Sequence, residues 1–350
     1  MRIEQLTFTR FIAALLIVIF HYGRDCFLFN NDYVSFIFTQ ANIGVSYFFI
    51  LSGFVMIIAY YNNTKIIFLK YMKNRLARIY PVYLLAIFLV LYINLFKVIN
   101  FTDLFLNILM IQSWIPEKAL TINFPGWSLS VELFFYLSFP FLFNFIYKKN
   151  TLKSIAFWII LFWLLSQIIF YLIVNTDFIT TPVYIIQDLH YNPLMHLNEF
   201  LIGNLAGLYF MSELKEKRKN YSVHILFMLL ILVLLFKFTF GLDYHNGLLA
   251  VIFVPLIVLI SLSTDKLTNL LRENFFVFLG EISFSIYILQ YPVWVLCSDY
   301  RLNKYFGIDK ESDISLSFFL RLAILIILSS ISYLFFEKPI RNKISNGMNN

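Results

Sequence analysis

The chain has 350 residues, of which 60% are hydrophobic and only 13% are charged. Ordinary soluble domains carry about 25% charged residues, so this composition excludes a water-soluble globule. The net charge of +7 would suggest nucleic acid in a soluble protein, but basic loops facing an anionic cytoplasmic leaflet explain it better here. The sequence therefore predicts an all-α, polytopic membrane protein.

Ten apolar stretches follow one another along the chain, each close to the roughly 20 residues that a spanning helix needs. They leave no room for a sizeable soluble domain, so we expect a single membrane domain over residues 1–350. The first stretch has no small-residue cleavage site after Phe20 and is expected to be retained as a span. The predicted spans are 6–24, 43–62, 79–99, 127–147, 152–174, 194–212, 222–240, 247–263, 275–298 and 315–336.

Two further features fix the expected topology. Residues 101–115 are too few and too polar at their flanks to span, and they predict an interfacial or re-entrant helix. With the N-terminus inside, 19 of the 27 Lys and Arg residues lie on the cytoplasmic side. The positive-inside rule then predicts both termini in the cytoplasm.

The first span carries two ionisable residues, Arg10 and His21. Their spacing of eleven residues is three helical turns plus about 20°, so both lie on one face, separated by about 16 Å along the axis. Arg10 could simply extend to the inner headgroups, and His21 could satisfy a buried polar contact. An intramembrane ionisable group is nevertheless a functional candidate, and a neutral imidazole can take up a proton near neutral pH.

The loop before the third span is rich in cations, and Arg75 and Arg78 lie three residues apart on one helical face. Two guanidinium groups at that spacing suit a polyanion such as a diphosphate. The alternative is ordinary positive-inside charge, which is the simpler explanation for the neighbouring lysines.

The fourth span opens with residues 123–136 (NFPGWSLSVELFFY), where Asn123 and Pro125 suit a helix start and Glu132 is expected about one to two turns inside the bilayer. Trp127 suits the aromatic belt at the far interface. A carboxylate within the bilayer needs a partner, and this span supplies no basic residue. We therefore expect the partner of Glu132 on another helix, and His21 is at a similar depth.

Several other polar positions have ordinary structural explanations. Gln290 is either an interhelical contact or an acceptor contact. Arg321 is expected to pair with a carboxylate, and Gly53 is expected to allow close helix packing. Cys26 and Cys297 both fall near far-side span ends, which leaves a disulfide open, although free buried thiols are the simpler interpretation. The five histidines show no metal-ligand spacing, so no metal site is predicted.

These residues lie in motifs that resemble, in order and over nearly the whole chain, the acyltransferase-3 family of integral-membrane O-acyltransferases. The motifs are Arg10 with His21, residues 48–54 (FFILSGF), 75–81 (RLARIYP), 127–136 (WSLSVELFFY), 199–203 (EFLIG), 280–287 (GEISFSIY), 290–292 (QYP) and 337–339 (EKP). The resemblance implies transfer of an acyl group, with acyl-CoA as the usual donor, to hydroxyls of surface polysaccharides, modified oligosaccharides or some antibiotics. It also implies that larger relatives carry an added esterase-like domain, for which this chain is too short.

The predicted depth of the charged residues in the membrane and this resemblance together lead us to expect an O-acetyltransferase of the bacterial inner membrane. We expect acetyl-CoA as donor, a glycan or its lipid-linked precursor as acceptor, and no permanently bound cofactor. A cytoplasmic layer would hold the donor phosphates, and a second layer about 16 Å further out would hold the catalytic pair. The competing hypotheses are a transporter or flippase of a polysaccharide intermediate, against which the halves show no repeat, and an acyltransferase for a small-molecule acceptor. The expected site residues are Arg10, Arg75 and Arg78 for the donor, His21 and Glu132 for catalysis, and Trp127, Ser128, Glu199 and Gln290 for substrate.

Overall fold

A computed structural model describes residues 3–93, 100–175, 188–309 and 312–346 of the chain. These residues are mostly helical and contain no β-strand, so the predicted all-α class is confirmed. The longer helices are α1 (Gln5–Tyr22), α3 (Gly44–Tyr60), α4 (Phe68–Ile93), α6 (Trp127–Phe141), α7 (Leu152–Asn175), α9 (Leu197–Tyr209), α10 (Ser222–Lys237), α11 (Ala250–Leu262), α13 (Asn274–Leu296) and α15 (Ile314–Ser332).

Within the described ranges, seven helical stretches are long and apolar enough to cross a membrane. This agrees with a multi-pass membrane protein. Three predicted spans correspond to shorter helices, because α9 gives way to a π-helix after Tyr209, and α10 and α11 have 16 and 13 residues. The seven stretches are Gln5–Tyr22, Ala41–Tyr60, Phe68–Ile93, Phe124–Tyr147, Leu152–Val174, Asn274–Leu296 and Ile314–Ile344.

The third span differs from its predicted range of 79–99. Its helix α4 already begins at Phe68, because the Lys and Arg residues that lower the local hydropathy are good helix formers. The last predicted positions, 94–99, lie outside the described residues. The cationic segment that carries Arg75 and Arg78 is therefore part of the spanning helix and not a loop before it.

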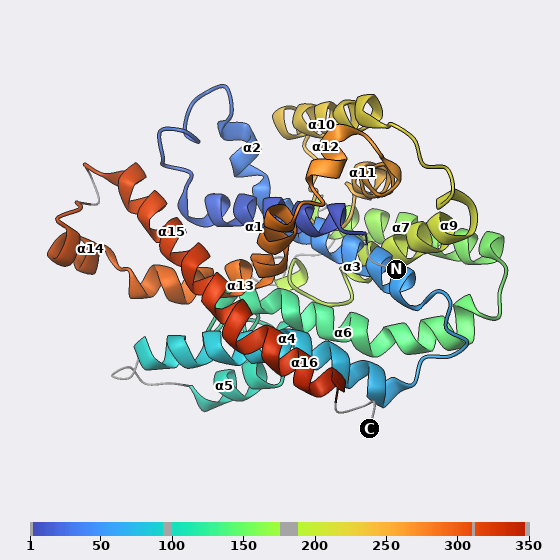
Figure 1. Cartoon of the computed structure of the whole chain (residues 1–350), viewed down its shortest axis with the longest axis horizontal. Coiled ribbons are helices and arrows are strands. Elements are labelled where there is room, and N and C mark those ends of the chain that lie inside the picture. Colours follow the sequence, from blue (N-terminus) through green and yellow to red (C-terminus); the bar gives the residue numbers. More distant parts are fainter. Residues whose placement is uncertain (1–2, 94–99, 176–187, 310–311, 347–350) are drawn as a thin grey trace.

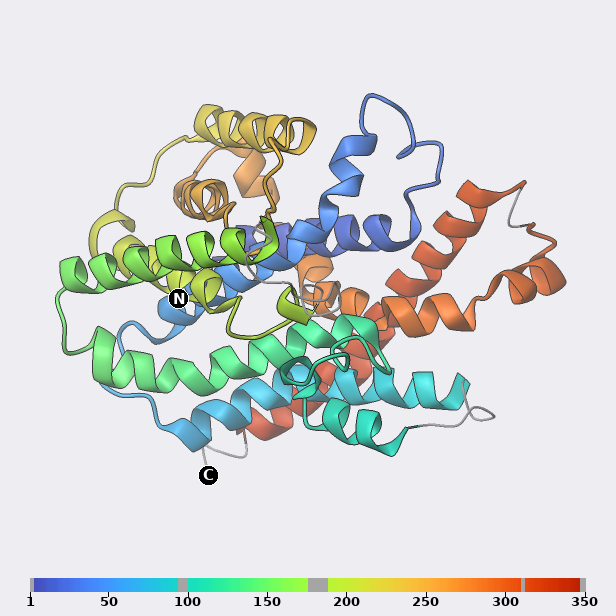
Figure 2. The same ribbon diagram turned by 180° about the vertical axis from the view of Figure 1, so that it is seen from behind.

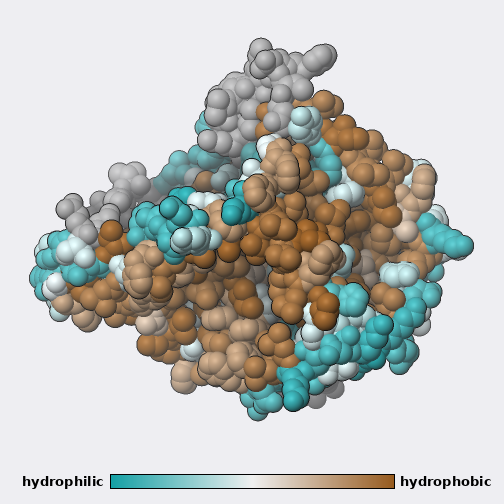
Figure 3. Space-filling model, turned by 90° about the horizontal axis from the view of Figure 1, so that it is seen from above, coloured by the Kyte–Doolittle hydropathy of each residue, from teal (hydrophilic) through white to brown (hydrophobic). Residues whose placement is uncertain are grey.

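The helices form an elongated bundle with α1 and α3 near its middle (Figures 1 and 2). One edge carries α10, α11 and the short α12 (Lys266–Leu270), and the opposite edge carries α4, α6 and the short α5 (Phe101–Ile108). The helix α5 occupies the segment predicted as too short to span. Figure 3 shows hydrophobic residues over most of one face, with hydrophilic residues gathered toward its margins, as expected for a surface that contacts lipid.

Glycines bring the central helices unusually close together. A Cβ atom at Gly53 of α3 would lie 2.2 Å from a backbone oxygen of α9, and one at Gly203 of α9 would lie 2.1 Å from a backbone oxygen of α3. Gly280 of α13 fits in the same way against the Thr7 carbonyl of α1, where a Cβ would lie 2.0 Å away. The close packing expected at Gly53 is thus confirmed, and these contacts set the positions of the helices that bear the charged side chains.

The last span contains an irregular turn. Its helix α15 continues through a π-helix, Tyr333–Glu337, into α16 (Lys338–Asn346). A π-turn inserts an extra residue and rotates the next helical segment relative to a regular helix. The π-turn ends at Glu337, whose side chain is buried.

Two smaller predictions concern Arg321 and the two cysteines, Cys26 and Cys297. Nη2 of Arg321 lies 2.5 Å from Oδ1 of Asp299, which confirms that Arg321 pairs with a carboxylate. Cys26 and Cys297 are both free thiols, in agreement with the simpler of the two interpretations.

Candidate functional site

The helices α1, α3, α4, α6, α13 and α16 surround a cavity of about 390 Å3. Along α3 its lining runs from Val45 to Ala59, a helical rise of about 21 Å. Arginines outnumber glutamates in the lining, so the cavity has a net positive charge and favours an anionic ligand. The charged lining residues are Arg10, Arg75, Arg78, Arg341, Glu132, Glu281 and Glu337.

Arg10 is at the centre of this set of charges. It lies within the first span, and the charges of Arg78, Glu132 and Glu281 all act on its guanidinium group. Opposite charges within a membrane interior stabilise one another, because each would otherwise lack the water that it loses on burial. The three arginines predicted to form one layer thus line a single cavity.

Three tyrosine rings surround the guanidinium group of Arg75. Its Cζ atom lies 5.5 Å from the ring centre of Tyr60, 5.4 Å from that of Tyr71 and 5.8 Å from that of Tyr136. Aromatic faces attract a cation most strongly where water is excluded. The three rings therefore hold Arg75 in place without neutralising its charge, which remains available to an anion in the cavity.

Glu132 lines this same cavity and accepts a hydrogen bond from the hydroxyl of Tyr136, one turn further along α6. The span begins with a 3-10 turn, Phe124–Gly126, at the place where Asn123 and Pro125 predicted a helix start. Glu132 follows Phe124 by eight residues, which is a rise of about 13 Å along the span. The structure brings Glu132 together with Arg10 on another helix, not with His21.

Glu337 forms the wall of the cavity at the last span. Its carboxylate accepts a hydrogen bond from Ser285 of α13 and lies 3.5 Å from Oγ of Ser332. Its side chain is buried, and the charges of Arg78 and Arg341 both act on it. The π-turn that ends at Glu337 thus connects the last span to α13 and places a carboxylate beside two cavity arginines.

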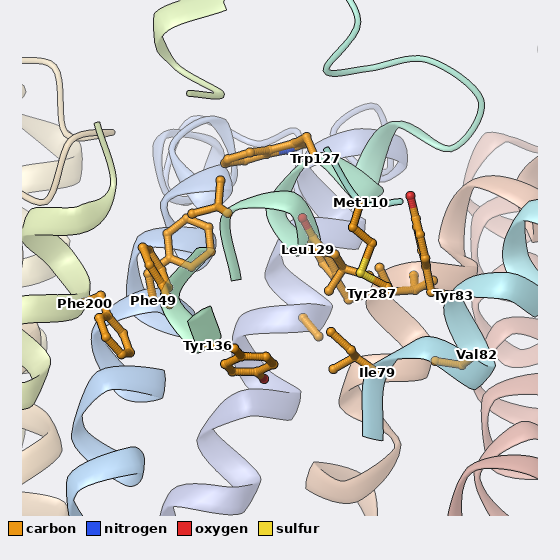
Figure 4. Close-up of a cluster of buried hydrophobic side chains, with 14 of the residues drawn as sticks. Phe49, Ile79, Val82, Tyr83, Met110, Trp127, Leu129, Tyr136, Phe200 and Tyr287 are labelled. Atoms are coloured by element: carbon orange, nitrogen blue, oxygen red, sulfur yellow. The ribbon is translucent and has the colours of Figure 1, made fainter. Parts of the chain in front are cut away.

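One end of the cavity is mainly apolar and aromatic. Phe48 of α3 and Tyr287 of α13 meet there with ring centres 6.1 Å apart, and Ser128 and Leu129 of α6 complete the lining. Figure 4 shows the surrounding cluster, with Phe49 and Phe200 on one side of Tyr136 and Ile79 on the other. Ser128 is the only one of the four predicted substrate-binding residues that lines the cavity within the described part of the chain. We call this part of the cavity the inner end.

His21 lies outside the cavity, at the end of α1. Its exposed side chain packs against the rings of Phe124, with centres 4.8 Å apart, and of Phe20, 5.0 Å away. Phe124 belongs to the 3-10 turn before α6 and precedes the lining residue Ser128 by four residues, while His21 itself shares no cavity wall with Glu132. The catalytic role of His21 stays a prediction.

The other three predicted substrate-binding residues also lie outside the cavity. Trp127 is buried with its ring centre 5.4 Å from that of His196, and Glu199 receives a 2.9 Å contact from Nδ1 of the same histidine. The amide of Gln290 donates to the Tyr287 carbonyl oxygen at 2.7 Å within its own helix. In this structure Trp127, Glu199 and Gln290 therefore lie outside the set of residues that line the cavity. Their contact with substrate stays a prediction.

Three charged lining residues, Glu281, Glu337 and Arg341, and the lining residue Tyr136 were not among the site residues expected from the sequence. Tyr136, Glu281 and Glu337 lie inside quoted motifs, so their motif membership was the signal that could have identified them. Arg341 comes two residues after the last motif and looks like ordinary positive-inside charge. Only the packing of α16 shows that Arg341 faces the cavity.

A bundle of membrane-spanning helices around an arginine-lined cavity defines an integral-membrane protein with a buried, positively charged site. Residues 3–336 match the family model described as an acyltransferase domain. The chain therefore belongs to the acyltransferase-3 family, as its motifs indicated. No solved structure is significantly similar to it.

Curated relatives extend this comparison. Acyltransferase MdmB of Streptomyces mycarofaciens is 33% identical over 160 residues, which cover 42% of this chain and 41% of MdmB. O-acetyltransferase OatA of Staphylococcus aureus is 26% identical over 368 aligned residues, which cover 95% of this chain and 56% of OatA. The putative acetyltransferase ORF330 of Acidianus two-tailed virus is 26% identical over 263 residues, 72% of this chain and 73% of that protein. The chain thus spans only about half the length of the first two relatives that it matches.

Proposed function

We propose that this protein is a membrane O-acyltransferase, most simply an O-acetyltransferase, that moves an acyl group from acyl-CoA to a hydroxyl of a surface polysaccharide or its lipid-linked precursor. The observation that carries the proposal is the cavity that combines Arg10, Arg75 and Arg78 with an uncharged inner end. Family membership and the printed names of the relatives support acyl transfer.

The shape of the cavity supports acyl-CoA as donor. Guanidinium groups bind phosphate oxygens in bidentate fashion, and Arg75 and Arg78 are adjacent on α4. A lining of about 21 Å along α3 is long enough for an extended pantetheine arm that leads from these arginines to the inner end. Glu132 lies along this path, where its carboxylate can accept a hydrogen bond from an amide of the arm. Its proposed role is therefore to orient the donor.

The acceptor hydroxyl would react near the inner end, with His21 as general base. The imidazole takes the hydroxyl proton while the oxygen attacks the thioester carbonyl carbon. The carbon–sulfur bond then breaks, and the CoA thiolate leaves and takes up a proton. His21 is exposed and packs on Phe124, so it is accessible to an acceptor that approaches from the end of α1 opposite to the N-terminus.

The proposed topology has ten spans in the bacterial inner membrane, with both termini in the cytoplasm. In this arrangement the shorter helices α9, α10 and α11 also cross the bilayer, and the basic residues 215–219 face the cytoplasm with the donor. Labelling of single cysteines introduced at Lys217 and Asn303 tests this topology. We expect cytoplasmic and periplasmic labelling respectively, and the same side for both would contradict it.

The function itself is tested in two steps. Purified protein should bind acetyl-CoA, and mass spectrometry of surface glycans should show acyl groups that are lost in a deletion strain and restored by the wild-type gene but not by a His21→Ala gene. A protein that binds no acyl-CoA, and whose deletion leaves glycan acylation intact while glycan export fails, would favour the transporter hypothesis.

A further inference from the structure

Arg341 is the one arginine of the described cavity lining to which the proposed function gives no task. It lies on α16, one turn after Glu337, and both side chains face the cavity. Residues four apart share a helical face, and the charge of Arg341 acts on the Glu337 carboxylate. Ser285 donates a hydrogen bond to the Glu337 carboxylate, which holds this carboxylate on the helical face that also carries Arg341.

The neighbouring cations on the same helix are arranged differently. Lys338 and Lys343 are exposed and do not belong to the lining, whereas Arg341 is half-buried and does. A helix that only supplied positive-inside charge would have no reason to direct its arginine inward, at the cost of removing it from water. The orientation of Arg341 therefore indicates a ligand group at the cytoplasmic end of the cavity.

The size of the cavity shows which part of the donor reaches this position. Small-ligand pockets measure about 300–1,000 Å3, so a cavity of about 390 Å3 is at the lower end of that range. It suits the pantetheine arm but not the whole of acyl-CoA, whose nucleotide must remain at the mouth. In the last span the lining proceeds from Tyr333 through Glu337 to Arg341, so Arg341 is its outermost contribution.

We propose that Arg341 binds the 3′-phosphate of the donor's adenosine moiety and that Glu337 positions it for this contact. This inference rests on acyl-CoA being the donor. Arg75 and Arg78 are then left for the diphosphate, and Arg341 adds a separate site for a phosphate monoester. A phosphate monoester could also come from an anionic lipid headgroup, and the experiment must separate these two sources.

The experiment measures the affinity of the full chain, in nanodiscs of zwitterionic lipid, for acetyl-CoA and for its 3′-dephospho analogue. Wild-type protein should bind acetyl-CoA about 10-fold to 100-fold more tightly than the analogue, because a charged hydrogen-bond pair is lost with the phosphate. Arg341→Ala should abolish this preference by weakening only the binding of acetyl-CoA, while the analogue binds as it does to the wild type. Lys343→Ala, on the same helix but outside the lining, should keep the full preference.

The other outcomes would overturn different parts of the proposal. Equal wild-type affinity for both nucleotides overturns the role of Arg341 but leaves acyl-CoA as donor, whereas wild-type binding of neither overturns the donor itself. If Arg341 binds a lipid headgroup instead, Arg341→Ala should change the affinities for acetyl-CoA and for its 3′-dephospho analogue equally, or change neither. Either result also overturns the proposal. Should Arg341→Ala fail to fold, Arg341→Gln keeps the length and polarity of the side chain, and its loss of the preference provides the same test.

Discussion

The guanidinium carbon of Arg75 lies 5.8 Å from the centre of the Tyr136 ring, and the hydroxyl of this same tyrosine donates a hydrogen bond to Glu132. Tyr136 therefore connects a cavity cation with a cavity carboxylate through two different parts of its side chain. The ring attracts the arginine, and the hydroxyl orients the glutamate. The two functions can be removed separately by substitution.

Tyr136→Phe keeps the ring and removes only the hydroxyl, so it should weaken acetyl-CoA binding less than Tyr136→Leu, which removes both. Loss of a desolvated cation–π contact worth about 1–2 kcal/mol should weaken acetyl-CoA binding by about 5-fold to 30-fold in the leucine variant. Isothermal titration of both purified variants provides the comparison. Equal losses in the two variants would show that Arg75 does not depend on the ring.

Arg78→Lys preserves the charge but removes the planar fork that binds a diphosphate. We expect normal insertion and acetyl-CoA binding that is weaker by about 10-fold, the effect of losing one charge-assisted hydrogen bond. Lys73→Ala is the matched control, because this exposed cation of the same helix lies outside the lining. Unchanged affinity in Arg78→Lys would assign this arginine to topology alone.

His21→Ala should lower the rate of acyl transfer by about 10²–10⁴-fold, the usual contribution of a general base. Its affinity for acetyl-CoA should not change, since His21 lies outside the cavity. Glu132→Gln should instead weaken the binding of acetyl-CoA more than it lowers the rate of acyl transfer. His224→Ala, an exposed histidine at the start of α10, should leave both quantities intact. An active His21→Ala protein would exclude the proposed base.

Gly203→Ala should destabilise the bundle. The added methyl group would lie 2.1 Å from the Ile50 carbonyl oxygen, so α3 and α9 must separate, at a cost of about 1–3 kcal/mol or more. Gly241→Ala is a useful comparison, because its φ of +69° disfavours a side chain but nothing lies within 4 Å. Thermal unfolding in detergent should show the larger decrease in Tm for Gly203→Ala. Equal decreases would mean that close contact is not what Gly203 provides.

Asp243 lies between α10 and α11, outside the spans, and its carboxylate contacts Nε2 of His190 at 2.9 Å and accepts from the His245 backbone N–H at 2.8 Å. Burial raises the pKa of this carboxyl, but the hydrogen bonds from His190 and His245 outweigh burial and lower it well below its ordinary value. A lowered pKa in the folded state means that the ionised form stabilises the fold, so the contribution is complete above about pH 5 and decreases as the pH falls below about 4.

Asp243→Asn should therefore lower the free energy of unfolding by about 1–3 kcal/mol at pH 7, the usual contribution of hydrogen bonds to a charged group. The difference from the wild type should shrink as the pH is lowered below about 4. Chemical denaturation of both proteins across this range measures it. A difference that grew on acidification would contradict the assignment of the stabilising charge to Asp243.

Much of the molecule could be predicted from the sequence alone, because hydropathy and charge are properties of segments. Apolar stretches of sufficient length predicted the long helices, and residue type was enough to predict a paired role for Arg321 and close packing at Gly53. The charge of Arg10, Arg75 and Arg78 was also sufficient to group these three residues, and they line one cavity. The motifs then identified the family, which the match over residues 3–336 confirms.

Only the tertiary structure determined which of the ionisable residues share a cavity. Depth along the spans paired Glu132 with His21, but in the structure Glu132 lines the cavity together with Arg10, and His21 lies outside it. Similarly, Tyr333, Glu337 and Arg341 recur every four residues, which allows them to share a helical face, but only the packing of this face shows that it lines the cavity. Hydropathy and charge describe each segment by itself, whereas the residues that share a cavity depend on how helices far apart in the sequence pack against one another.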